Sequence, residues 1–355
     1  MPALPTPPAG QKVLVSGANG FVAIWVVRAL LERGYAVRSS VRAAVKGRHL
    51  EAVFAQYGDQ HEVVVVPDIT APGAFDEAVK GVDAIQHIAS PVPVYADGEN
   101  MITPAVNGTL GMLQSAMKHG DALKRVVVTS SVAAVLHIGP EPQEFDEHDW
   151  NEQCLEVLAR GDADPSVTTL VKYLASKTLA EKAVWKFWED NRGRIEWDIV
   201  ALNPPYVRSQ PVMHDIATPS ALGASMSEWF TNVAKIGATD EFLASAGGGY
   251  IDVRDLADAH ALALEKQAAG SKRIIVCAGA FKWQDFLDAA NTISPPLKLS
   301  TPLPVGVPGA GSASPGAVHM FTYKTDRAAE VLGLKYRSLT DTTRDILTDY
   351  EARGW

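Results

Sequence analysis

A tyrosine and a lysine, Tyr173 and Lys177, stand at positions i and i+4 of the run YLASK. In a helix these positions lie on one face, so the two side chains are expected to be neighbours. A nearby ammonium favours the ionised form of a tyrosine and lowers its pKa from about 10. Such a tyrosine can deliver a proton to a carbonyl oxygen as a general acid. The pair predicts acid–base chemistry, although this spacing also occurs by chance.

Two adjacent serines follow an apolar run that predicts a strand at residues 125–128. Ser130 and Ser131 lie at the end of this strand, where a hydroxyl could stabilise a developing alkoxide. Side chains alternate between the two faces of a strand, so the two serines point in opposite directions. Only one of them can join Tyr173, and the residues alone leave that choice open.

A glycine turn connects the first predicted strand, residues 12–15, to an amphipathic helix over residues 21–33. The turn contains Gly17, Asn19 and Gly20. Glycines let the backbone approach a phosphate closely, and a helix N-terminus favours negative charge. Because the spacing departs from the standard dinucleotide fingerprint, an ordinary strand-to-helix turn is the alternative interpretation.

Basic residues gather where the second predicted strand, residues 35–41, ends. Arg38 and Arg42 lie in or just after it, Lys46 follows, and residues 35–49 contain no Asp or Glu. An acidic residue here would bind the ribose 2′-hydroxyl of NAD, whereas arginine suits the 2′-phosphate of NADP. The pattern favours NADP(H) over NAD(H). The alternative is that these are solvated surface charges.

Strands and helices alternate along the chain, which predicts a doubly wound α/β fold with a parallel sheet and right-handed crossovers. The strand at residues 61–66 contains four consecutive valines, as expected when both faces of a strand are covered. Asp68, in the loop after it, could accept from an adenine amino group, or it could simply close a turn. Further strands are expected at residues 82–88, 195–202 and 273–277, helices at 75–79, 103–119 (capped by Thr103), 170–191, 323–332 and 339–352, and an irregular acidic segment at 139–163.

Composition sets limits on partners and location. The formal net charge of −9 argues against nucleic acid as the main partner. No stretch approaches the roughly 18 apolar residues of a membrane span. The two cysteines form no disulfide framework or zinc pattern, so we expect no metal and a reducing, cytoplasmic compartment.

The domain division follows from the order of the elements. We expect residues 10–203 to form the nucleotide-binding domain, with residues 248–278 returning to it. Residues 204–247 and 279–355 would form a smaller substrate lobe. Between residues 204 and 249 only Arg208 and Lys235 are basic, which favours an uncharged, apolar or aromatic carbonyl substrate over a sugar-nucleotide diphosphate. The Pro-, Gly- and Ser-rich residues 301–316 predict a long loop, which we consider as a lid.

Taken together, these motifs resemble those of an extended short-chain dehydrogenase/reductase. The similarity is greatest to the dihydroflavonol-4-reductase and cinnamoyl-CoA reductase branch, and within it to fungal and yeast NADPH-dependent aldehyde/ketone reductases. The segments that carry it are VSGANGFVA (15–23), FDEAVKGVDAIQHIASPV (75–92), VVVTSS (126–131), YLASKTLAEKAVWKF (173–187) and YIDVRDLADAH (250–260).

The resemblance implies NADPH-dependent reduction of aldehydes or ketones by a Ser–Tyr–Lys site, carried over here as Ser131, Tyr173 and Lys177. We expect a monomer or homodimer. Expected substrate contacts are Val92, Ser131, Tyr173, Tyr206 and Met226. Expected cofactor contacts are Gly17, Asn19, Gly20, Phe21, Val22, Arg38, Arg42, Lys46, Asp68, Ile69, Ala89, Ser90, Pro91, Thr129, Tyr173, Lys177 and Pro204.

Two alternatives remain open at this stage. One is another enzyme of the same superfamily, either a hydroxysteroid dehydrogenase or a nucleotide-sugar dehydrogenase/epimerase. The other is a non-catalytic regulator that senses NADP. Such regulators usually lose the tyrosine of the pair, whereas Tyr173 is present here.

Overall fold

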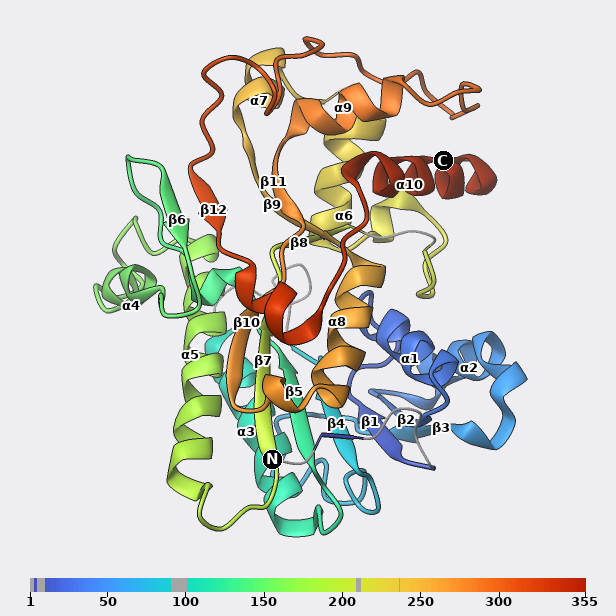
Figure 1. The fold of residues 1–355 in the computed structure, drawn as a ribbon, viewed down its shortest axis with the longest axis vertical. Coiled ribbons are helices and arrows are strands. Elements are labelled where there is room, and N and C mark those ends of the chain that lie inside the picture. Colours follow the sequence, from blue (N-terminus) through green and yellow to red (C-terminus); the bar gives the residue numbers. More distant parts are fainter. Residues whose placement is uncertain (1–2, 5–9, 91–100, 209–211, 236) are drawn as a thin grey trace.

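The computed structural model describes residues 3–4, 10–90, 101–208, 212–235 and 237–355. Its centre is a seven-stranded parallel sheet in the order β10-β7-β5-β4-β1-β2-β3 (Figure 1). The chain runs from β1 to one edge of the sheet and then continues from β4 to the other edge. This reversal between β1 and β4 is where a doubly wound sheet opens a crevice for a ligand. The strands are β1 (Lys12–Val15), β2 (Ala36–Val41), β3 (His61–Val65), β4 (Ala84–His87), β5 (Arg125–Thr129), β7 (Asp198–Asn203) and β10 (Lys272–Ile275).

Helices cover both faces of this sheet, which confirms the predicted doubly wound fold. In β1, Val13 and Val15 pack into the core cluster with α1, α2 and α8, whereas Leu14 packs into the opposite cluster with α3 and α5. This is the alternation that a strand buried on both faces requires. The helices are α1 (Ala23–Glu32), α2 (Ala44–Val53), α3 (Ile102–His119), α5 (Thr169–Asn191) and α8 (Val253–Glu265).

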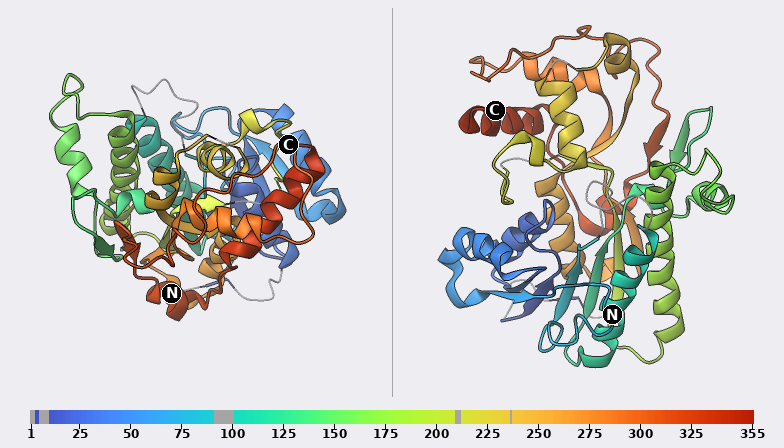
Figure 2. Two further views of the ribbon diagram at one scale, coloured as in Figure 1. Left: turned by 90° about the horizontal axis from the view of Figure 1, so that it is seen from above. Right: turned by 180° about the vertical axis from the view of Figure 1, so that it is seen from behind.

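A smaller lobe lies beyond the carboxyl ends of the large sheet (Figures 1 and 2). The chain enters it directly from β7 and again from β10. Its three-stranded sheet has the order β11-β9-β8, and its aromatic core includes Trp229, Phe281, Phe286 and Tyr350. The lobe contains β8 (Tyr206–Arg208), α6 (Ala224–Trp229), α7 (Asp240–Ser245), β9 (Gly247–Asp252), β11 (Gly279–Lys282), α9 (Trp283–Asn291) and α10 (Leu339–Arg353).

One strand lies elsewhere than the predicted domain division suggests. The returning segment 248–278 was assigned to the nucleotide half, and α8 and β10 pack there. Strand β9, however, pairs with β8 and β11 in the small sheet. The two halves are also joined by a two-stranded sheet of β6 (Gln143–Phe145) and β12 (Phe321–Tyr323).

Several predicted elements are corrected by the structure. Residues 75–79 form turns instead of a helix. Helix α3 begins at Ile102 without a side-chain cap, so Thr103 does not cap it. The segment 139–163 contains β6 and a helix, α4 (Glu152–Leu158), and the predicted helix at 323–332 is reduced to one π-helical turn, Ala328–Leu332, after β12. Among the described strands, β3 lies at the edge of the sheet, and its Val65 is exposed.

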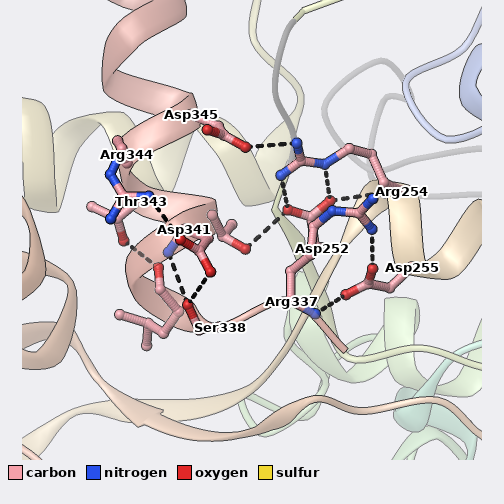
Figure 3. A network of polar contacts seen from close by, with 11 residues as sticks. Asp252, Arg254, Asp255, Arg337, Ser338, Asp341, Thr343, Arg344 and Asp345 are labelled. Atoms are coloured by element: carbon pink, nitrogen blue, oxygen red, sulfur yellow. Dashed lines mark hydrogen bonds and ion pairs between the residues drawn. The ribbon is translucent and has the colours of Figure 1, made fainter. Parts of the chain in front are cut away.

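A charged network attaches the C-terminal helix α10 to the start of α8 (Figure 3). Asp252 caps α8 by accepting from the Arg254 N–H at 2.9 Å, and the Arg254 guanidinium pairs with Asp345 of α10 at 2.6 Å. Asp255 accepts from the backbone N–H of Arg337 at 2.7 Å. These carboxylates are therefore structural, and they hold α10 and the segment before it against the start of α8.

Candidate active site

The structure brings Ser131, Tyr173 and Lys177 together. Tyr173 and Lys177 lie one turn apart on α5, and the Lys177 ammonium is 6.0 Å from the centre of the Tyr173 ring. The Tyr173 hydroxyl hydrogen-bonds the side chain of Ser131, which follows β5. Lys177 also donates to the Ser90 hydroxyl at 2.9 Å, next to the end of β4. The residues therefore converge at the carboxyl edge of the large sheet.

The two serines diverge as their alternation predicts. Ser130 is buried and donates to the Glu181 carboxylate at 2.6 Å. Ser131 accepts from the Ala133 N–H at 3.1 Å, which leaves its own proton available for a neighbouring oxygen. Of the two, only Ser131 contacts Tyr173.

The electrostatics of the pair differ from the expectation. Burial raises the pKa of Tyr173, and its hydrogen bond to Ser131 offsets part of that rise. Burial also lowers the pKa of Lys177 to about 8. The predicted lowering of the Tyr173 pKa by the ammonium is therefore wrong for this structure. Both groups are buried, and the loss of hydration is the largest cause of the pKa shift at each of them.

The glycine turn after β1 forms a cradle that side chains would fill. Gly17 has φ of +64°, and a Cβ there would lie 3.1 Å from the Cβ of Ala89 at the β4 end. Gly20 donates to the Gly17 carbonyl at 2.9 Å, and no side chain caps the start of α1. Asn19 lies in this turn, and Phe21 and Val22 follow it before α1 begins. A glycine surface and a helix N-terminus without a side-chain cap suit a phosphate.

Ser16, to which the sequence analysis assigned no role, links this cradle to the loop after β4. Its hydroxyl accepts from the N–H groups of Ile88 and Ala89, each at 3.0 Å, and so donates to His87 Nδ1 at 3.0 Å. At the end of β5, Thr129 bonds His260 at 3.0 Å, and His260 in turn bonds Gln86 of β4. Buried hydrogen bonds thus align the ends of β1, β4 and β5.

The buried histidines make stability depend on pH. Burial lowers the pKa of His87 to about 4 and that of His260 to about 3, from an ordinary value of 6.5. Below pH 6.5 the unfolded chain binds protons that the folded chain excludes, so stability falls as the pH falls. We expect each histidine to cost about 2 kcal/mol between pH 7 and pH 5. Urea unfolding followed by tryptophan fluorescence measures this. A stability that is level over this range would contradict it, as would an unchanged slope in His87→Gln.

The predicted 2′-phosphate ligands separate in the structure. Arg42 is exposed, and no hydrogen bond or ion pair reaches its side chain from the described parts of the chain. It lies near Asp68, whose pKa is lowered first by hydrogen bonds from Thr70 and also by the Arg42 charge. Lys46 is half exposed, with its ammonium 4.0 Å from the Asp215 carboxylate. Arg42 and Lys46 are thus available to an anion.

Arg38 is corrected. Its guanidinium donates to the Glu62 carboxylate at 2.8 Å and to the carbonyls of Ala78 and Lys80, each at 2.7 Å. Lys80 and Ala78 precede β4, so the group points away from the carboxyl edge where the cradle lies. With these partners, Arg38 supports the sheet and is withdrawn as a phosphate ligand.

Three other predicted cofactor contacts lie near the carboxyl edge of the large sheet, where they make packing or turn contacts within the protein. Ile69 is half-buried against α3, where a Cβ on Gly108 would come within 3.0 Å of it. Asp68 closes a turn onto Thr70. Pro204 is buried, and its carbonyl accepts from the Val132 N–H at 3.1 Å, which fixes the loop carrying Ser131. Pro91 and Val92 lie outside the described residues.

Of the predicted substrate contacts, Tyr206 is accessible at the surface and Met226 is buried in the lobe core. Tyr206 is 42% exposed and near enough to Tyr173 for that group to raise its pKa, although burial is the main cause of the rise. Met226 is 1% exposed and packs in the lobe core, so its prediction as a substrate contact is corrected. Arg208 is fully buried, with its guanidinium 4.9 Å from the centre of the Trp283 ring, and Lys235 is exposed.

The loop at residues 301–316 is attached along α9 at the outer side of the lobe (Figure 1). Gln284 donates to the Val305 carbonyl at 2.9 Å and accepts from the Val307 N–H at 3.0 Å. Asp285 accepts from the Ser312 N–H at 2.8 Å. These bonds hold the loop against α9, which argues against the predicted lid.

Neither a metal-binding cluster nor a membrane-spanning helix is found among the described residues. Over these ranges no three or more His, Cys, Asp or Glu side chains are grouped so that they could hold a metal ion. Among the helices that the structure describes, none combines the length and apolar character needed to span a membrane.

Comparison with known proteins identifies the relatives of this chain. The NADPH-dependent methylglyoxal reductase GRE2 of Saccharomyces cerevisiae is 36% identical over 347 residues, covering 94% of this chain and 96% of the yeast protein. Aldehyde reductase 2 of Sporidiobolus salmonicolor is 32% identical over 348 residues, covering 96% of each chain. The crystal structure of yeast methylglyoxal/isovaleraldehyde reductase Gre2 complexed with NADPH has a TM-score of 0.79 at 31% identity, covering 97% of this chain and 100% of that chain.

A family model, described as the NAD dependent epimerase/dehydratase family, matches residues 13–278. The match runs from Val13 of β1 through β10, and it includes the glycine cradle and the Ser131, Tyr173 and Lys177 cluster. This chain therefore belongs to the NAD dependent epimerase/dehydratase family, the extended short-chain dehydrogenases/reductases, as its motifs indicate.

Proposed function

We propose that this protein reduces aldehydes or ketones to alcohols with NADPH as hydride donor. The observation that carries the proposal is the contact of Tyr173 with Ser131 and Lys177 at the carboxyl edge of the sheet, together with the glycine cradle after β1. The relatives named as NADPH-dependent methylglyoxal reductase and aldehyde reductase support the same reaction class and cofactor.

When bound, NADPH would supply a hydride to the carbonyl carbon. Tyr173 holds the proton that its hydroxyl delivers to the carbonyl oxygen. The Ser131 hydroxyl donates to that same oxygen and stabilises the charge that develops on it. Lys177 would donate to the ribose hydroxyls of the cofactor. A raised Tyr173 pKa keeps the group protonated at neutral pH, as a general acid must be.

The cofactor is held by groups at the ends of three strands. The cradle of Gly17, Asn19 and Gly20 would take the pyrophosphate, and Ala89 and Ser90 would border it from β4. Arg42, with Lys46 beyond it, would take the 2′-phosphate, which is why NADPH is preferred to NADH. Phe21, Val22, Asp68, Ile69, Thr129 and Pro204 complete the proposed set.

The substrate is an uncharged carbonyl compound with an apolar or aromatic body. Tyr206 presents an exposed ring beside Tyr173. The lobe offers few cations to a diphosphate, since Arg208 is buried among aromatic rings. A sugar-nucleotide substrate would need such cations.

The proposal extends to the roles of the two domains, the oligomeric state and the cellular compartment. The large sheet binds the nucleotide and the lobe binds the substrate. The protein acts as a monomer or homodimer in the cytoplasm. Cys154 and Cys277 support a reducing compartment because both are buried and free.

The proposal is tested by following NADPH consumption against a panel of aryl ketones, β-keto esters and aldehydes, with NADH in parallel. Turnover with NADPH on apolar members is the expected result. Tight NADPH binding without turnover on any member would support the non-catalytic regulator instead. Turnover on a hydroxysteroid or nucleotide sugar alone would show that the protein has another activity of the family instead.

A further inference from the structure

Glu181 is buried directly behind the cluster of Ser131, Tyr173 and Lys177. It lies on α5, four residues after Lys177 and eight after Tyr173, and is therefore near the same helix face. Its side chain is 1% exposed. A carboxylate at this depth requires hydrogen-bond donors, and four residues of the structure supply them.

The four donors come from different elements. Glu181 Oε2 accepts from the Ser130 hydroxyl at 2.6 Å and from Asn203 Nδ2 at 2.8 Å. Glu181 Oε1 accepts from Arg273 Nε at 2.6 Å and from Trp185 Nε1 at 3.2 Å. Ser130 follows β5, Asn203 ends β7 and Arg273 lies in β10. One carboxylate thus connects three neighbouring strands to α5.

These bonds act on the backbone that carries Ser131. Ser130 is the preceding residue, and the same Asn203 amide that bonds Glu181 also donates to the Ser131 carbonyl at 3.1 Å. Ser131 is therefore held from both sides of its own peptide unit. Arg273 extends the support outward by donating to the carbonyls of Glu147 and Asp149.

We propose that Glu181 is the positioning residue of this active site: it sets the distance between Ser131 on the strand side and Tyr173 on the helix side. This inference rests on the proposed reductase function. It assigns Glu181 no contact with substrate or cofactor. Reaction rates are sensitive to displacements of about 1 Å at reacting groups, so a loosened Ser131 lowers kcat.

The test is Glu181→Gln, which keeps the side-chain shape but turns an N–H₂ group toward donors. We expect kcat to fall by about 10- to 100-fold, while the KM for NADPH stays unchanged because the cradle is not involved. The matched control is Asp198→Asn, since Asp198 is equally buried and pairs with Arg125 at 2.6 Å where β5 and β7 begin. That variant loses stability and keeps kcat.

A double-mutant cycle decides whether Glu181 acts through Ser131. In a Ser131→Ala background, Glu181→Gln should lower kcat by less than about twofold, because the group it positions is gone. An equal loss in both backgrounds overturns the inference, as does an unchanged kcat in Glu181→Gln. If that variant does not fold, Ser130→Ala replaces it, since this change removes one bond and keeps the Arg273 pair. A wild-type protein without turnover refutes the reductase function itself, and the inference falls with it.

Discussion

Replacing Tyr173 with phenylalanine is expected to lower kcat/KM for carbonyl reduction by about 10²- to 10⁴-fold, the contribution of a general acid. The change removes one oxygen and leaves the ring under Lys177 in place. Hydride transfer would then leave an alkoxide without a proton donor. NADPH binding is expected to persist, because Lys177 and the glycine cradle remain. Steady-state kinetics with NADPH, together with NADPH fluorescence titration, separate the two quantities.

Tyr57→Phe is the matched control, because it makes the same chemical change in the turn that follows α2, outside the active-site cluster. It should leave kcat/KM unchanged. If Tyr173→Phe retained activity within about tenfold of the wild type, the proton would come from another group or from water. The role assigned to Tyr173 would then be wrong.

Replacing Arg42 with alanine is expected to change cofactor preference. A hydrogen bond to a charged group contributes about 1.5–3 kcal/mol, so the KM for NADPH should rise by about 10- to 100-fold. The KM for NADH should stay the same, since NADH has no 2′-phosphate. The ratio of kcat/KM values for the two cofactors therefore falls by the factor that NADPH loses.

Arg48→Ala controls for the change in net charge, because Arg48 is also exposed and lies further along α2. It should leave both cofactors unaffected. Equal losses with NADPH and NADH in Arg42→Ala would mean that the change disturbs the fold. If Arg42→Ala caused no loss with either cofactor, Lys46 would become the proposed ligand of the 2′-phosphate. Replacing Lys46 would then be expected to raise the KM for NADPH.

The local features of this protein were accessible from the sequence. Strand β1, the glycine turn and α1 depend on residues close in the chain, through apolar periodicity and the positive φ that Gly17 adopts. The adjacency of Tyr173 and Lys177 follows from helix geometry alone. Their effect on each other does not, because the pKa of each group depends on burial by residues from other elements.

The tertiary structure decided which side chains became available for chemistry. Ser130 and Ser131 are equivalent in sequence, but Glu181, 51 positions from Ser130, engages the first and leaves the second facing Tyr173. Arg38 and Arg42 look alike in the sequence, yet of the two only Arg38 is bound, by Glu62 and two backbone carbonyls. Strand order likewise put the valine-rich β3 at an edge. Periodicity governs neighbours along the chain, whereas these pairings arise only when distant segments pack together and buried polar groups must find partners.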